Sequence, residues 1–156
     1  MVAPTLAPAP TSCAGPKPHR EKVSPDLAPL AGQRPVWAGF YAPLDVKSGA
    51  LHLPTDTPRT SNGWRIKTLW AVAEDQQGLV KVRGDDIKTG AVVRFKVGEA
   101  AISTTGVLDP RKPGTVTAAG EPREFPSYLY FAASGCYELH ASWPGGGWKM
   151  VLGVGR

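Results

Sequence analysis

Along most of the chain after Pro35, apolar and polar residues alternate with a period of two. In the last such run, Trp148, Met150, Leu152 and Val154 occupy every second position. Successive side chains of a β-strand point to opposite faces of its sheet, so this alternation places one set of side chains on one face. The pattern therefore predicts short β-strands whose apolar faces meet in an interior layer.

The predicted strands are separated by residues that favour tight turns. Asn62-Gly63 and Thr89-Gly90 mark turns, and Pro144–Gly147 indicates a hairpin loop. No connection is long enough for the crossover helix that parallel strands need. The sequence therefore predicts an all-β fold, a two-sheet antiparallel sandwich. Its expected strands are Val36–Tyr41, Ala50–Leu53, Trp64–Val72, Leu79–Arg83, Ala91–Val97, Ile102–Val107, Thr115–Ala118, Tyr128–Ala132, Cys136–Trp143 and Trp148–Val154.

The beginning of the chain differs in composition from the rest, because proline is concentrated there. The prolines of this stretch are Pro4, Pro8, Pro10, Pro16, Pro18, Pro25, Pro29 and Pro35. Such a segment favours extended conformations and carries few groups that can pack a core. We therefore expect residues 1–34 to form a Pro-rich arm and residues 35–156 to form the β-sandwich domain.

The chain contains two cysteines, Cys13 in the arm and Cys136 in the penultimate expected strand. In an exported domain an even number of cysteines suggests a disulfide, and two free thiols are the alternative. A bridge between them would close a loop of about 120 residues and would hold the arm against the sandwich.

The chain carries a formal net charge of +5, with an isoelectric point near 9.4. This excess favours anionic partners such as cell-surface polymers or lipid head groups, and an ordinary solubilising charge is the alternative. No run approaches the roughly 18 apolar residues of a membrane span. The first residues lack the basic start and apolar run of a signal peptide. We expect a secreted or extracytoplasmic protein whose export signal is not present in this chain.

Part of this positive charge falls in pairs at alternate positions on three expected strands. The pairs are Arg65 and Lys67, Lys81 and Arg83, and Arg94 and Lys96. Residues two apart on a strand share a face, so the pattern predicts one basic face if the three strands adjoin. This face is our candidate binding site for an anionic cell-surface polymer or a protein partner, and a solvated sandwich surface is the alternative. A specific nucleic acid partner is not expected, because no aromatic residues interleave with the cations along the sequence.

The aromatic residues allow two interpretations. Most of them alternate with polar residues on expected strands, which favours packing in the core. A carbohydrate- or peptide-binding platform formed by the aromatic residues is the alternative. The placement is least determined for Trp37, Tyr41, Tyr128 and Tyr130.

Sequence patterns of enzymes and of metal sites are missing from the chain. It contains no Gly-x-Ser-x-Gly elbow, no phosphate-binding Gly-rich loop and no His-Glu-x-x-His motif. We therefore expect no catalytic residues, no cofactor and no metal ligands. A hydrolase or metal-binding protein remains the alternative, with a site assembled from distant residues. Its only candidate parts are His52, His140 and the pair Asp85 and Asp86.

The end of the chain resembles a group of largely uncharacterised exported bacterial proteins. The resemblance rests on Phe125–Phe131 followed by the Gly-Cys-aromatic-Glu motif of Gly135–Leu139, and on Ser12-Cys13 in the arm. It implies an immunoglobulin-like sandwich, an extracytoplasmic location and a bridge between Cys13 and Cys136. It implies no activity, so the expected function is that of a non-catalytic binding or interaction module.

Overall fold

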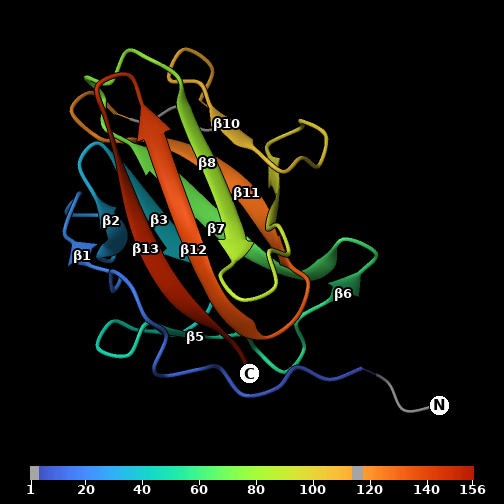
Figure 1. Cartoon of the computed structure of the whole chain (residues 1–156). Coiled ribbons are helices and arrows are strands. Elements are labelled where there is room, and N and C mark those ends of the chain that lie inside the picture. The colour runs from blue at the N-terminus through green and yellow to red at the C-terminus, as the bar shows by residue number, and fades with distance from the viewer. Residues whose placement is uncertain (1–3, 114–117) are drawn as a thin grey trace.

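The computed structural model describes residues 4–113 and 118–156, and these form two packed β-sheets without a helix. Sheet A has the strand order β1-β2-β3-β7-β11-β9, and β6 pairs with the free end of β7. Sheet B has the order β10-β8-β12-β13-β5-β4. Figure 1 shows the two layers, with β13, β12 and β8 in front of β3, β7 and β11. The predicted all-β, two-sheet sandwich is confirmed.

The strands of each sheet have the following bounds. Sheet A contains β1 (Arg20–Glu21), β2 (Leu30–Gln33), β3 (Val36–Phe40), β6 (Arg59–Thr60), β7 (Gly63–Val72), β9 (Arg94–Val97) and β11 (Arg123–Phe131). Sheet B contains β4 (Leu44–Asp45), β5 (Ala50–His52), β8 (Val80–Asp86), β10 (Gly106–Leu108), β12 (Gly135–Trp143) and β13 (Gly146–Gly155). The pairing is antiparallel except between β13 and β5, which run parallel.

The expected strands correspond to β3, β5, β7, β8, β9, β10, β11, β12 and β13, with shifted ends. Among them, β11 begins five residues before the expected Tyr128, at Arg123. The polar Ser127 occupies a buried position next to Pro126 and so breaks the apolar alternation that would have extended the prediction. The run expected at Thr115–Ala118 lies outside the described residues, apart from Ala118.

The core between the sheets is built by the alternating apolar residues. Trp70 of β7 stacks on Trp148 of β13 with ring centroids 6.4 Å apart, and the Trp148 indole N–H donates to the Val36 carbonyl at 2.9 Å. Phe131 meets Tyr137 edge-on at 5.0 Å. These contacts join the two sheets at positions that the period of two had placed inside.

The N-terminal segment belongs to the sandwich more fully than the sequence predicted. The boundary expected at Pro35 is wrong as the start of the sheets, because β1 and β2 lie before it and pair with each other and with β3. Two apolar residues between these strands, Val23 and Leu27, pack against Trp37 on the outer face of sheet A. These residues form a second small core outside the sandwich interior. The sequence did not predict it, because its strands are short and its apolar residues are spaced irregularly among prolines.

The first part of the segment crosses the outer face of sheet B. The Val151 amide of β13 donates to the Pro16 carbonyl at 2.7 Å, and the Arg156 amide donates to the Ala7 carbonyl at 3.0 Å. A Cβ atom on Gly153 would overlap the Pro10 carbonyl oxygen, so glycine is needed there for the close approach. In Figure 1 this dark blue stretch passes the C-terminus.

A disulfide joins Cys13 to Cys136 across 123 positions of sequence, with an S–S distance of 2.01 Å. The predicted bridge is therefore confirmed, and the alternative of two free thiols is wrong. On the chain-entropy account a loop of this length stabilises the fold by about 4 kcal/mol. The bridge fixes the N-terminal segment to β12 next to its crossing of β13.

Candidate functional site

The six cations predicted to form one basic face lie on two different sheets. Arg65 and Lys67 belong to β7, and Arg94 and Lys96 belong to β9, so these four are on sheet A. Lys81 and Arg83 belong to β8 of sheet B. The prediction of a single face is therefore wrong. Strands β7, β8 and β9 follow one another along the chain, but β8 crosses to the other sheet and β11 lies between β7 and β9.

The four cations of sheet A share its outer face with three tyrosines. Tyr128 of β11 pairs with Lys67 on one side and with Lys96 on the other, and Tyr130 pairs in the same way with Arg65 and Arg94. The Tyr41 amide donates to the Lys67 carbonyl, which sets Tyr41 beside Lys67. We call this surface the basic–tyrosine face; its members are Arg65, Lys67, Arg94, Lys96, Tyr41, Tyr128 and Tyr130.

The register sets the spacing of the charges on this face. Neighbouring strands lie about 4.8 Å apart, so the cation columns of β7 and β9 are separated by about 10 Å, with the tyrosines of β11 between them. Within each column the two cations are about 7 Å apart along the strand. The face therefore presents two parallel rows of positive charge on either side of an aromatic centre.

Two of the cations are held against tyrosine rings. The Arg65 guanidinium lies 4.8 Å from the ring centroid of Tyr128, and the Lys67 ammonium lies 5.1 Å from that of Tyr41. Contacts of this kind contribute about 0.5–1 kcal/mol at exposed sites. Within the described residues, none of the four cations forms an ion pair. The rings order Arg65 and Lys67, and the Lys96 ammonium donates to the Ala100 carbonyl at 2.9 Å. No acid of the described residues neutralises the charge of the four cations.

The tyrosines interleave with the cations on this face, although the sequence predicted no such interleaving. Along β9, Phe95 separates Arg94 from Lys96 but points into the core. On the outer face the aromatic residues alternate with the cations across strands, because β11 lies between β7 and β9. The alternation of Tyr128 and Tyr130 with the apolar Leu129 and Phe131 was the available signal for an outward position. The local sequence does not show which strands pair with β11.

The outer face of sheet B has a different charge balance. Lys81 and Arg83 share it with His140 and Ser142, which are their partners on β12. Asp85 and Glu138 form the next pair of the same ladder. Glu138 is in an ion pair with Lys149 at 3.6 Å, and the Arg83 Nε donates to Thr105 at 3.1 Å. This face therefore carries both acids and cations, and one acid is in an ion pair.

The residues proposed for a hydrolase or metal site are not brought together. His52 contacts the Arg156 carbonyl through Nδ1 at 3.2 Å, at the opposite end of sheet B from His140. The Asp86 carboxylate accepts the amides of Lys88 and Thr89 and so closes the turn after β8. Over residues 4–113 and 118–156, no group of three His, Cys, Asp or Glu residues could hold a metal ion. The alternative therefore has no assembled site among these residues.

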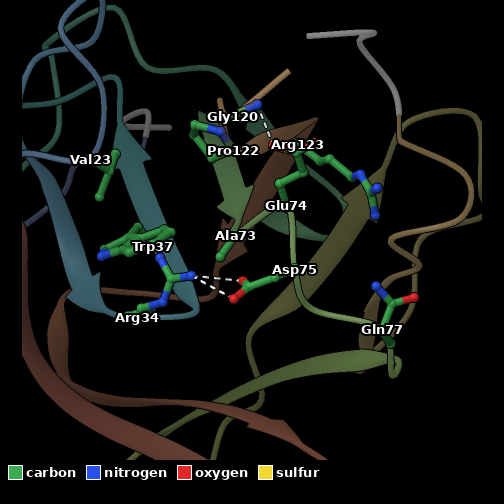
Figure 2. Close-up of a pocket in the computed structure, with 10 residues that line it drawn as sticks. All are labelled: Val23, Arg34, Trp37, Ala73, Glu74, Asp75, Gln77, Gly120, Pro122 and Arg123. Carbon is green, nitrogen blue, oxygen red and sulfur yellow. Dashed lines mark hydrogen bonds and ion pairs between the residues drawn. The ribbon is translucent and has the colours of Figure 1, made fainter. Parts of the chain in front are cut away.

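A hollow of about 500 Å³ lies where the second small core meets the end of β11. Figure 2 shows Arg34 and Asp75 pointing toward one another across it, and their two hydrogen bonds are both 2.8 Å long. The Arg123 guanidinium donates to the Pro110 carbonyl, and the Glu74 carboxylate accepts the Gly120 amide. Because the charged groups of this hollow already have protein partners, it offers a weaker anion site than the basic–tyrosine face.

Burial and local hydrogen bonds shift the pKa of several described residues. Burial raises the pKa of Tyr137 above its usual value, and the nearby Asp86 carboxylate acts in the same direction. Hydrogen bonds from Ser48 and Arg111 lower the pKa of Asp45 and Asp109, respectively. These groups stabilise turns and the core; they do not point to acid–base chemistry in a cleft.

The comparisons with known proteins do not assign a family. No protein-family model matches the chain, and no curated protein matches it. The chain is similar to a solved structure, the ASH / PapD-like domain of human CEP192 (PapD-like domain 7), with 10% identity over 86% of this chain and 94% of that one. The TM-score is 0.31, so nothing is inferred from this similarity. No helix among the described residues is long and apolar enough to span a membrane.

Proposed function

We propose that this protein is a non-catalytic extracytoplasmic binding module whose basic–tyrosine face binds an anionic surface polymer. The single observation that carries the proposal is the uncompensated charge of that face. Four cations stand in two rows, and no described acid pairs with any of them. Like charges crowded on one sheet are mildly destabilising, so an anionic partner gives a physical reason for their presence.

The geometry of the face fits a linear polyanion. Two rows about 10 Å apart can contact anionic groups on both sides of a chain that lies along β11. Cations held on tyrosine rings have less conformational freedom to lose on binding, which favours affinity. The disulfide and the resemblance of Gly135–Leu139 to exported bacterial domains support an extracytoplasmic location.

A single-stranded nucleic acid is a different class of partner, and the tyrosines make it worth testing. Single-strand binders stack bases on aromatic faces. Here Arg65 already lies over Tyr128, Lys67 lies over Tyr41, and Tyr130 is only 4% exposed. Tyr41 is 56% exposed, but the two tyrosines between the cation rows, Tyr128 under Arg65 and the buried Tyr130, offer little free surface for stacking. The face therefore favours a polymer recognised through its charge.

Calorimetric titration with heparin and with wall teichoic acid tests the proposal. The Lys67→Gln/Lys96→Gln variant removes one cation from each row and should bind at least about tenfold more weakly, because fewer counterions are released. The matched control is Lys81→Gln/Arg83→Gln, which removes the same charge from sheet B. It should bind within about twofold of the unmodified protein, because its cations face the other way.

Two further results would decide the class of the partner. Affinity of the unmodified protein should fall by roughly tenfold to a hundredfold between about 50 and 200 mM salt. Equal losses in the two double variants would contradict the proposal, because net charge alone would then explain binding. An oligo(dT) strand bound more tightly than both polymers, with the loss reproduced by Tyr128→Ala, would assign the face to nucleic acid instead.

A further inference from the structure

A second concave feature lies beside the basic–tyrosine face, at the end of sheet A. It is a shallow hollow of about 510 Å³ between the turn that joins β6 to β7 and the loop that precedes β9. Residues 59–63 form one side, residues 90–92 and Arg94 form another, and Ala132 completes it. Arg94 belongs to this hollow and to the basic–tyrosine face, so the two surfaces are continuous.

The turn on one side of the hollow is fixed by its own hydrogen bonds. The Thr60 hydroxyl donates to the Gly63 carbonyl at 3.0 Å, and the Asn62 amide donates to the Thr60 hydroxyl at 3.1 Å. Gly63 has a φ of 118°, and a Cβ there would lie 2.5 Å from the Phe131 carbonyl oxygen. This close approach requires glycine and holds the turn against the end of β11.

Two arginines line the hollow, and no carboxylate does. The Arg59 guanidinium lies 5.9 Å from the ring centroid of Trp64, which orients it. Neither Arg59 nor Arg94 forms an ion pair or a side-chain hydrogen bond within the described residues. The side chains of Ser61 and Asn62 add hydrogen-bond donors at the same site.

We propose that this hollow binds a tetrahedral oxyanion, a phosphate or sulfate ester carried on a sugar or polyol unit. Two guanidinium groups match the charge of a phosphate monoester dianion and exceed the single charge of a sulfate ester, and their forked donors match the oxygens of either group. The volume leaves room for the unit that carries the ester, since small-molecule sites occupy about 300–1,000 Å³. The inference rests on the proposed function in one respect: the ester would be part of the polymer bound along β11, reached through Arg94.

Titration followed by ¹H–¹⁵N correlation spectra tests this site with three small probes. Glycerol 3-phosphate and glucose 6-sulfate distinguish the two esters, and glucuronate presents a planar carboxylate of similar size. At least one ester should shift the Gly63 amide and the Asn62 side-chain signals. Arg59→Gln should weaken that ester at least about tenfold, because a hydrogen bond to a charged group is lost.

Asn62→Ala keeps the test informative if Arg59→Gln unfolds, and Lys81→Gln is the control of equal charge on sheet B. The proposal is overturned if the esters leave the turn at 60–63 unshifted, or if Arg59→Gln and Asn62→Ala both bind them as the unmodified protein does. Glucuronate bound as tightly as both esters would overturn the assignment to a tetrahedral anion.

The failure of this site and the failure of the proposed function give different results. Lys67→Gln/Lys96→Gln should lose heparin and keep the ester, because neither lysine lines the hollow. Ester binding without any heparin binding would support the hollow and contradict the polymer face. Heparin binding that depends on Lys67 and Lys96, without ester binding, would leave the face and remove the hollow.

Discussion

The outer faces of the two sheets differ in what balances their charge. On sheet B, Glu138 pairs with Lys149, Asp85 lies in the same ladder, and the N-terminal segment covers part of β13. On sheet A, the tyrosines of β11 lie between the cations of β7 and β9, and no acid of the described residues forms an ion pair with these cations. The outer face of sheet B therefore carries acids beside its cations, whereas on the outer face of sheet A tyrosines lie between the cations and no described acid pairs with them.

The two sheets also differ in how much of the outer face the N-terminal segment covers. Sheet A is covered at one end, where Val23 and Leu27 pack on Trp37. Its other end, which carries the basic–tyrosine face, has no such cover among the described residues. Within the described residues, the N-terminal segment contacts both sheets but does not cover the basic–tyrosine face, whose cations form no ion pair. An uncovered face of this kind is what a binding surface requires.

The largest expected effect on stability comes from removing the disulfide that holds the N-terminal segment on sheet B. Cys13→Ser/Cys136→Ser should lower the free energy of unfolding by about 4 kcal/mol, because the long loop is no longer closed in the unfolded chain. Denaturant unfolding followed by tryptophan fluorescence measures it. Heparin affinity of the folded variant should not change, and a parallel loss of affinity would show that the covered face takes part in binding.

A smaller effect is expected from Gly153→Ala. The added methyl group would overlap the Pro10 carbonyl oxygen and push the N-terminal segment off β13. We expect a loss of about 2 kcal/mol in unfolding free energy, the usual cost of overpacking. Hydrogen exchange should speed up at Arg156, whose amide donates to the Ala7 carbonyl. Unchanged exchange there would mean that the segment is not held by this contact.

Tyr137 provides a pH-dependent contrast with the tyrosines of the outer face. Its hydroxyl donates to the Ala133 carbonyl at 2.7 Å, and burial raises its pKa. The fold therefore favours the neutral phenol, so this contribution to stability is complete below about pH 10 and falls as pH rises through the folded pKa. Tyr137→Phe should cost about 1 kcal/mol at neutral pH and should make the alkaline decline shallower. Unfolding free energies between neutral and alkaline pH check this, and an equally steep decline in the variant would contradict it.

The smallest effects should have opposite signs on the two faces. Arg94→Gln removes an unpaired cation from sheet A and should leave stability equal or raise it by up to about 0.5 kcal/mol. Lys149→Gln removes the ion-pair partner of Glu138 on sheet B and leaves Glu138 opposite Asp85 without a counter-charge, so it should lower stability by about 0.5 kcal/mol. Thermal melts at low salt measure both changes. Effects of the same sign would mean that the charge balance of the two faces does not differ as described.

The sequence predicted the elements of this fold better than their arrangement. Alternation in the run from Trp148 to Val154 placed strand and buried face correctly, because a period of two follows from strand geometry alone. The bridge between Cys13 and Cys136 was predictable because an even pair has one partner choice. Strands β1 and β2 were missed, because their stability comes from pairing with β3 and from contacts of Val23 and Leu27, not from their own pattern.

The candidate site could be predicted less well than the fold, because it depends on which strands are neighbours. Local alternation correctly placed each cation pair on the outer side of its strand, but it could not state which sheet each strand joins. The crossing of β8 to sheet B separated Lys81 and Arg83 from the other four cations. The insertion of β11 between β7 and β9 brought Tyr128 and Tyr130 among them. Both results depend on pairing between distant segments, which a single sequence does not contain.

The most direct test of the central claim is a map of the surface that a heparin oligosaccharide covers, by amide shifts of the unmodified protein during titration. The account predicts that the shifted amides lie on β7, β9 and β11, around Lys67, Tyr128 and Lys96, while those of β8 and β12 stay in place. Shifts centred on Lys81, Arg83 and His140, or spread evenly over both sheets, would contradict it.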